Sequence, residues 1–117
     1  MTKTLSEQQV RFFRHNGFII LLNAISTDTC NDLIRQIEID LIAEKEPLER
    51  SSSGRIRRLS QLFTRDKCFE ALAKRPNVIN PLTSLLGENI ELILNRHNHT
   101  TIKFRNAQEP RLHRDIL

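Results

Sequence analysis

Apolar residues recur at helical spacing over the stretch that follows residue 26, which is the pattern of a helix with one buried face. Ser26 or Thr27 can cap this helix at its start, and Pro47 indicates that it has already ended. The sequence therefore predicts a helix that runs to about residue 44. The residues that form its apolar face are Cys30, Leu33, Ile34, Ile37 and Leu41.

Three further helices are predicted from their end signals. Ser6 and Gln9 have the spacing of a capping box, and Gly17 suits a helix end, which places a helix over residues 7–16. Asp66 can cap a short helix in DKCFEALAK. A last helix is expected over residues 76–86, because proline is favoured at the first helical position and a glycine follows at the end.

Strands are predicted in three places. The run FIILL, residues 18–22, is continuously apolar and is typical of a buried strand. Residues 89–104 are rich in β-branched residues with loose alternation, which favours a strand or a bent strand pair, and residues 111–117 are expected to begin another strand. Between the helices, SSSG indicates a loop. Four apolar residues after it are expected to return to the core: Ile56, Leu59, Leu62 and Phe63.

These elements predict one α+β domain over residues 1–117. Residues 1–86 are mainly helical, and residues 87–117 begin a β-core. A chain of this length can enclose a single core. The predicted strands leave open edges, so we expect that oligomers can form through exposed strand edges.

The positive charge of the chain is concentrated in one segment. The net charge is +4, but residues 50–75 carry eight basic and two acidic side chains. This segment lacks the interleaved aromatic residues that stack on bases, so no nucleic-acid partner is expected. Three interpretations stay open: a phosphate, CoA-type or acidic-partner site, a kinase recognition string ending at Ser60, or a solvated loop. The arginines concerned are Arg50, Arg55, Arg57 and Arg58.

The sequence contains no apolar stretch of membrane-spanning length, and its polar first residues lack the apolar region of a secretory signal. Cys30 and Cys68 are far apart and are not part of a C-x-x-C motif, so both are interpreted as free thiols in a reducing compartment. We therefore expect a cytoplasmic protein that makes no membrane contact.

Histidines gather near the end of the sequence. His97 and His99 would share one face of a strand, and His113 and Asp115 would share a face of another. Imidazole and carboxylate groups suit iron(II), zinc and manganese. A lone H-x-D is common by chance, and the two earlier histidines also fit ordinary strand residues. A further alternative is that His97 or His99 supplies a third ligand beside the H-x-D pair.

The order of motifs resembles the N-terminal part of the phytanoyl-CoA dioxygenase-like family. LSEQQVRFFRHNGFIILLNAIS is similar to that family's opening helix, N-G-F turn, apolar strand and helix cap. LLGENIELILNRHNHT resembles its lead-in strand, and RLHRDIL resembles its first iron-binding motif. The resemblance covers essentially the whole chain in order. It implies an incomplete double-stranded β-helix (a jelly-roll or cupin-like core) after the N-terminal helices.

The resemblance also implies a function and a set of residues. Family members are iron(II)- and 2-oxoglutarate-dependent dioxygenases that act on small molecules, with a facial triad of two histidines and one carboxylate. Matched by motif, His113 and Asp115 are two of the three iron ligands. Asn98 and His99 match the cosubstrate-facing strand and are expected to contact 2-oxoglutarate or the groups around the metal.

Two of the family's residues have no counterpart here. The distal histidine and the arginine that pairs with 2-oxoglutarate lie downstream of H-x-D in the family, and no histidine follows His113 in this sequence. The expectation is therefore a truncated dioxygenase that binds iron weakly and is inactive alone. The alternatives are a non-catalytic interaction or oligomerisation module and a partial metal-binding remnant.

Overall fold

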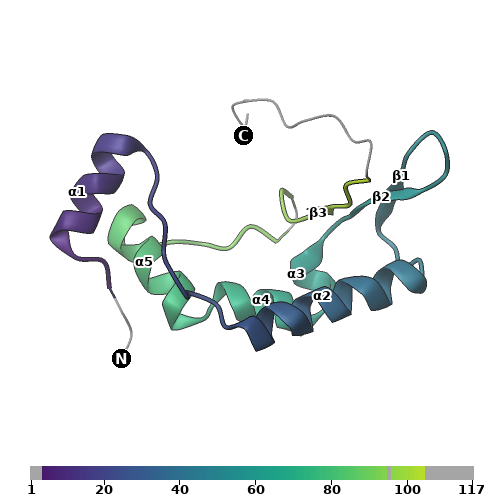
Figure 1. Cartoon of the computed structure of the whole chain (residues 1–117), viewed down its shortest axis with the longest axis horizontal. Helices are drawn as coiled ribbons and strands as arrows, with labels where there is room; N and C mark the ends of the chain where they lie inside the picture. The colour runs from purple at the N-terminus through teal and green to yellow at the C-terminus, as the bar shows by residue number, and fades with distance from the viewer. Residues whose placement is uncertain (1–3, 95, 105–117) are drawn as a thin grey trace.

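The computed structural model describes residues 4–94 and 96–104, which form helices and one small sheet (Figure 1). The helices are α1 (Glu7–Asn16), α2 (Thr27–Ile42), α3 (Leu62–Arg65), α4 (Lys67–Ala73) and α5 (Pro76–Leu86). The strands are β1 (Leu48–Arg50), β2 (Ile56–Leu59) and β3 (Thr100–Thr101). The mixture of helices with an antiparallel sheet agrees with the predicted α+β class. None of the helices in these two ranges is long and apolar enough to cross a membrane.

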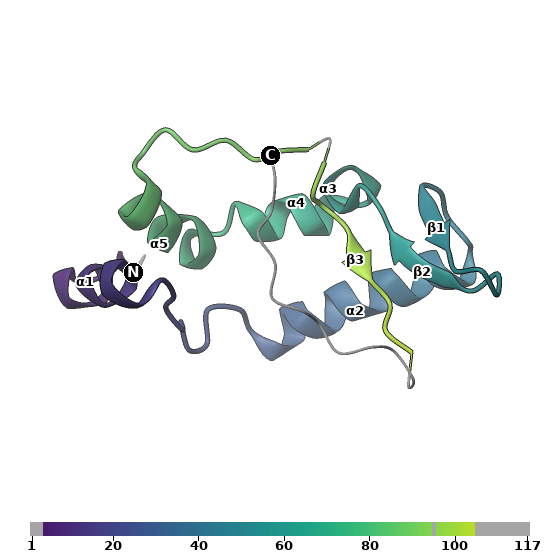
Figure 2. The same cartoon turned by 90° about the horizontal axis from the view of Figure 1, so that it is seen from above.

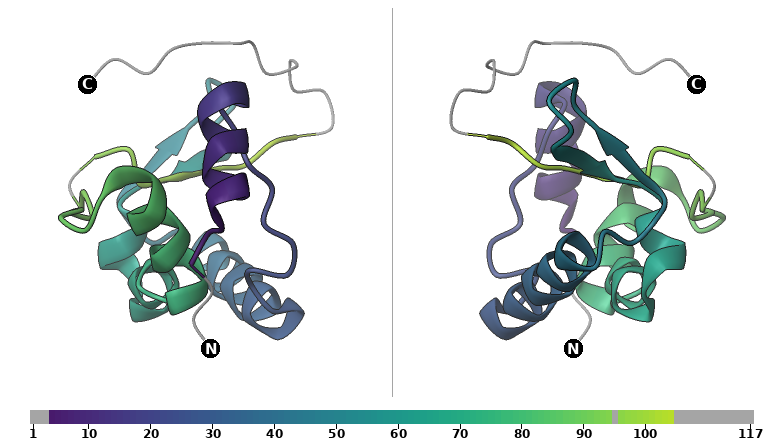
Figure 3. Two further views of the ribbon diagram at one scale, coloured as in Figure 1. Left: turned by 90° about the vertical axis from the view of Figure 1, so that its left-hand side faces the viewer. Right: turned by 90° about the vertical axis from the view of Figure 1, so that its right-hand side faces the viewer.

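The molecule is elongated. Its principal extents are 49 × 30 × 26 Å and its radius of gyration is 16.5 Å, whereas a compact chain of 100 residues has a radius of about 13 Å. Helices α1 and α5 lie at one end and the β1–β2 hairpin lies at the other (Figure 1). Between them α2 runs beside α4, and the sheet lies on one side of this helical layer (Figures 2 and 3).

The helix ends follow the local signals in the sequence. The Ser6 hydroxyl accepts a hydrogen bond from the backbone N–H of Gln9 at 3.2 Å, and the Gln9 side chain accepts from the backbone N–H of Ser6 at 2.9 Å. Gly17 ends α1 in the left-handed conformation, with φ at 80°. Ser26 caps α2 by accepting from the backbone N–H of Thr29. The predicted helices 7–16 and 76–86 and the start of the second helix are confirmed.

Residues 48–59, which include the first part of the basic segment, form a hairpin that the sequence did not predict. Strands β1 and β2 pair antiparallel, with Leu48 opposite Leu59 and an irregularity between Glu49 and Arg50. The SSSG tetrapeptide forms the connecting turn, as predicted for a loop, and Gly54 has a positive φ of 87° there. Leu59 is fully buried, which confirms that this stretch returns to the core.

The predicted strand at residues 18–22 is wrong. This segment lies outside the sheet and connects α1 to α2, and Phe18, Ile20 and Leu22 are exposed. A run of apolar residues becomes a buried strand only when another strand pairs with it, and none does so in the part of the chain that the structure describes.

The predicted strand over residues 89–104 is also largely wrong. Among residues 89–94 and 96–104, only Thr100–Thr101 forms a strand, and it pairs with β2 to complete a sheet of order β1-β2-β3. His97 has a positive φ of 57°, which turns the chain just before the pairing begins. The strand predicted at residues 111–117 lies outside the described residues.

A buried ion pair holds the centre of the molecule together. The side chains of Arg65 and Asp40 are 1% and 2% exposed, and Arg65 Nη1 lies 3.3 Å from Asp40 Oδ2. The same guanidinium donates to the backbone carbonyls of Lys45, Pro47 and Ser60. One side chain of α3 therefore joins α2, the loop after it and the end of β2.

Candidate functional site

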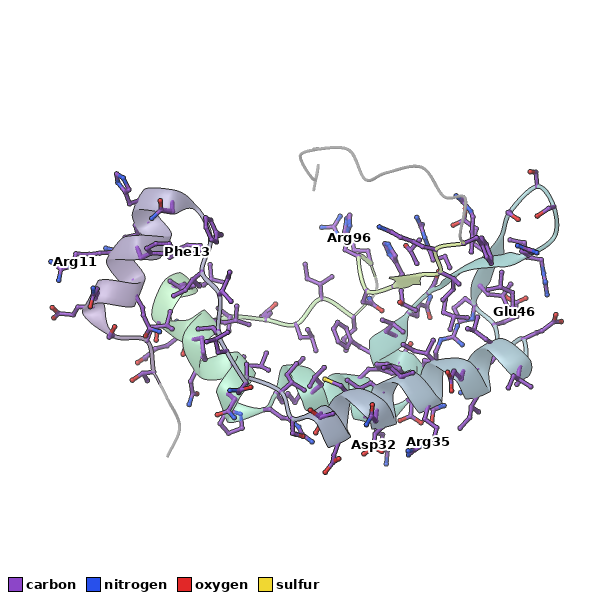
Figure 4. All side chains as sticks on the ribbon, in the orientation of Figure 1. Arg11, Phe13, Asp32, Arg35, Glu46 and Arg96 are labelled. Atoms are coloured by element: carbon purple, nitrogen blue, oxygen red, sulfur yellow. The ribbon has the colours of Figure 1, made fainter. Side chains whose placement is uncertain are left out.

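The loop before β3 brings the candidate residues near position 98 to the basic hairpin. Pairing places Arg58 opposite Thr101 and Leu59 opposite Thr100. Because Leu59 is buried, its neighbour Arg58 lies on the opposite face of the sheet. Arg96, at the start of the loop, points away from the helical layer (Figure 4). Arg58 and the histidine loop therefore lie on neighbouring strands of the sheet.

Asn98 organises this loop from inside. It is 6% exposed, and its Nδ2 donates to the carbonyls of Leu94 at 2.8 Å and Arg96 at 3.2 Å. Its own carbonyl accepts from the backbone N–H of Leu62 at 2.9 Å, which fixes the loop to α3. Asn98 Oδ1 is buried, and no described group donates a hydrogen bond to it. The amide thus holds the turn that carries the two histidines.

His97 and His99 do not share the face of a strand, so that part of the sequence interpretation is wrong. The chain bends at residues 96–97, which include the first of the two expected strand positions, and both histidine side chains are exposed. Partial burial lowers the pKa of His99, and the positive charges of Arg58 and His97 lower it further. The neutral imidazole is consequently favoured at His99, and this is the form that accepts hydrogen bonds and binds metals.

The arginines of the hairpin are engaged within the protein. Arg50 lies 3.2 Å from Glu44, and Glu49 pairs with both Arg57 and Arg58. The guanidinium of Arg55 stands 5.0 Å from the centroid of the Phe104 ring. These exposed ion pairs are the arrangement expected of a solvated, salt-bridged face. The sequence left three interpretations of these arginines open, and none of them included the effect of the Arg58 charge on the pKa of His99.

Arg58 differs from its neighbours in one respect. Its Nε is buried and finds no acceptor in the described part of the chain, while its Nη1 lies 3.2 Å from Glu49 Oε2. Glu49 is also the partner of Arg57, so one carboxylate serves two guanidinium groups. The positive charge of Arg58 is therefore only partly compensated, and it acts on the neighbouring His99.

The residues that would hold iron cannot be placed together from the structure. His113 and Asp115 lie outside the described residues. Within 4–94 and 96–104, no group of three His, Cys, Asp or Glu side chains is arranged to hold a metal ion. The chemistry of the donor set still fits iron(II), because one imidazole and one carboxylate are two of the ligands of a facial triad.

The structure thus brings Asn98, His99 and Arg58 together where the loop before β3 meets β2. It assigns Asn98 a role in the loop and leaves His99 accessible to a ligand. Comparison of the whole chain with protein-family models, with curated proteins and with solved structures found no match.

Proposed function

We propose that this chain carries part of the site of an iron(II)- and 2-oxoglutarate-dependent dioxygenase of the phytanoyl-CoA dioxygenase-like type, with His113 and Asp115 as two of the three iron ligands, and that it is inactive alone. The observation that carries the proposal is the H-x-D triplet placed after two other family-like motifs in the family's order. The capped helix α1, its glycine end and the capped start of α2 agree with the helical parts of the opening motif, whereas the apolar strand of that motif is absent from the described residues.

Four residues contribute to the proposed site: His113, Asp115, His99 and Asn98. The His113 imidazole and the Asp115 carboxylate hold the metal on one face. When bound, iron(II) and 2-oxoglutarate supply oxygen activation coupled to decarboxylation of the cosubstrate. His99, kept neutral by its surroundings, accepts a hydrogen bond from groups around the metal, and Asn98 fixes the loop that positions it. The substrate is a small molecule, and a double-stranded β-helix is the fold proposed for the strands around the site.

Two protein ligands hold a metal weakly, and the sequence has no histidine after His113. The candidates for a third protein ligand within the chain are His97 and His99. We expect weak metal binding and no 2-oxoglutarate turnover by this chain alone, measured as succinate released with added iron(II) and ascorbate.

The direct experiment is a cobalt(II) titration followed by absorption spectroscopy. His113→Ala and Asp115→Ala are each expected to weaken binding at least tenfold, because each removes one of two ligands. His15→Ala is the matched control, since His15 is an exposed histidine at the end of α1. Equal cobalt affinity in all four proteins would show that the H-x-D pair is not a metal site.

Two additional variants test the third ligand. His97→Ala and His99→Ala are titrated in the same way, and weaker binding in either one assigns the third ligand to that residue. Unchanged binding in both variants would show that neither His97 nor His99 is a ligand, and the proposed metal site would then consist of His113 and Asp115 alone.

A further inference from the structure

Helix α1 and the segment that connects it to α2 together expose four large apolar side chains, which we call the apolar stripe: Phe12, Phe18, Ile20 and Leu22. They are 47%, 54%, 73% and 85% exposed. The rings of Phe12 and Phe18 meet edge to face, with centroids 5.6 Å apart. Every second residue of the segment points outward, because Ile19 and Leu21 between them are half-buried.

A hollow lies next to the stripe. Its volume is about 330 Å³, and it is lined by residues of α1 and of the connecting segment: Gln8, Gln9, Phe12, Phe18, Ile19 and Ile20. A projecting Leu22 and a hollow thus occur on the same surface, a few residues apart. A two-fold axis near Ile20 would seat Leu22 of each copy in the hollow of the other, which is how a self-complementary interface is built.

The area of the stripe is close to what a dimer contact needs. With roughly 180 Å² for a fully exposed large apolar residue, the exposed fractions give roughly 470 Å². A standard interface buries about 800 Å² per partner, and about 65% of a homodimer interface is apolar, which gives roughly 520 Å². The four side chains therefore supply most of the apolar area of one side.

The charge pattern points to a second copy of the chain as the occupant. No charged residue occurs from Asn16 to Thr27. At a two-fold axis each residue meets its own copy, so any charge there would face a like charge. We propose that the apolar stripe is the contact surface of a homodimer, with Ile20 nearest the axis. This proposal is independent of the metal chemistry, and a cobalt titration can fail without affecting it.

The first test compares Leu22→Lys with Ile42→Lys by sedimentation velocity over a concentration series up to about 100 μM. Both leucine and isoleucine are 85% exposed, but Ile42 lies at the end of α2, outside the stripe. The wild type and Ile42→Lys are expected to dimerise alike. Leu22→Lys is expected to weaken dimerisation at least about 100-fold, because a symmetric contact loses two leucines.

Circular dichroism confirms that each variant is folded. A monomeric wild type, a Leu22→Lys dimer of unchanged affinity, an equal loss in both variants or open-ended aggregates in place of a dimer would each overturn the proposal.

The second test places a cysteine at the axis. Ile20→Cys and, as its control, Ile42→Cys are prepared with Cys30→Ser, which removes the exposed native thiol. Under mild oxidation Ile20→Cys is expected to form a disulfide-linked dimer many times faster than Ile42→Cys. Equal rates of cross-linking would contradict the placement of the stripe at the interface.

Discussion

Replacement of Arg65 by methionine is expected to destabilise the protein more than any other single change considered. The substitution preserves much of the side chain's length and removes its charge. Asp40, 2% exposed, then keeps a buried negative charge whose remaining contact is the Gln36 amide at 3.0 Å. The carbonyl of Lys45 also loses its donor, and that of Pro47 keeps the backbone N–H of Ser60.

The magnitude follows from the cost of leaving one member of a buried ion pair alone, about 3–5 kcal/mol. Domains of this size are stable by about 5–15 kcal/mol, so the loss is a large share of the total. With a urea dependence of about 1–3 kcal/mol per molar, the unfolding midpoint should fall by about 2 M. Far-ultraviolet circular dichroism is the suitable probe, because the sequence contains neither tryptophan nor tyrosine.

Two comparisons make the experiment specific to the buried pair. Arg35→Met removes an exposed arginine that lies 2.9 Å from Asp32 on the outer side of α2 (Figure 4), and it should cost less than about 0.5 kcal/mol. Adding Asp40→Leu to Arg65→Met should recover about 2 kcal/mol, because the uncompensated charge is removed as well. An Arg65→Met protein whose free energy of unfolding lies within about 1 kcal/mol of the wild type would refute the reasoning.

Three further outcomes follow from the titrating groups. A hydrogen bond from the backbone N–H of Cys68 holds the pKa of the Asp66 carboxyl below its ordinary value of 3.8. The stability that this cap contributes is therefore fully present above pH 3.8 and is lost as the pH falls through the lowered pKa. Asp66→Asn should flatten that part of an acid-denaturation curve. Partial burial and the charge of Arg58 lower the pKa of His99, so Arg58→Met should raise it in a proton NMR titration; an unchanged value would contradict the coupling. Burial raises the pKa of the Cys68 thiol to about 11, so iodoacetamide at pH 8 should modify the exposed Cys30 much faster, as peptide mass spectrometry would measure.

The helices could be predicted because their end signals are local. Ser6, Gln9 and Gly17 lie within a dozen residues of one another, and each satisfies backbone groups of the same helix. The same holds for Asp66, which caps the turn that directly follows it. Such signals depend on a few neighbouring residues and not on the rest of the fold.

The sheet could not be predicted in this way, because pairing joins distant residues. Arg58 meets Thr101 across more than forty positions, and a hairpin rich in arginine lacks the usual strand signal. Arg65 and Asp40 are 25 residues apart, and only the packed structure shows that both are buried. At the candidate site, the sequence pattern identified His99 as a candidate binding residue. The alternation of a strand did not hold there, because the positive φ of His97 turns the chain.

Helix α1 contains no buried residue, and the backbone N–H of Leu5 just before it donates to the Ser84 hydroxyl of α5 at 3.4 Å. The Arg65 network joins α2, α3 and the end of β2 and makes no contact with α1, so it does not hold α1 in place. Residues 4–25 should therefore open as a separate unit, at a lower free energy than global unfolding. In a native-state hydrogen-exchange experiment, the amides of α1 would exchange through local opening, whereas those of α2 would exchange only through global unfolding.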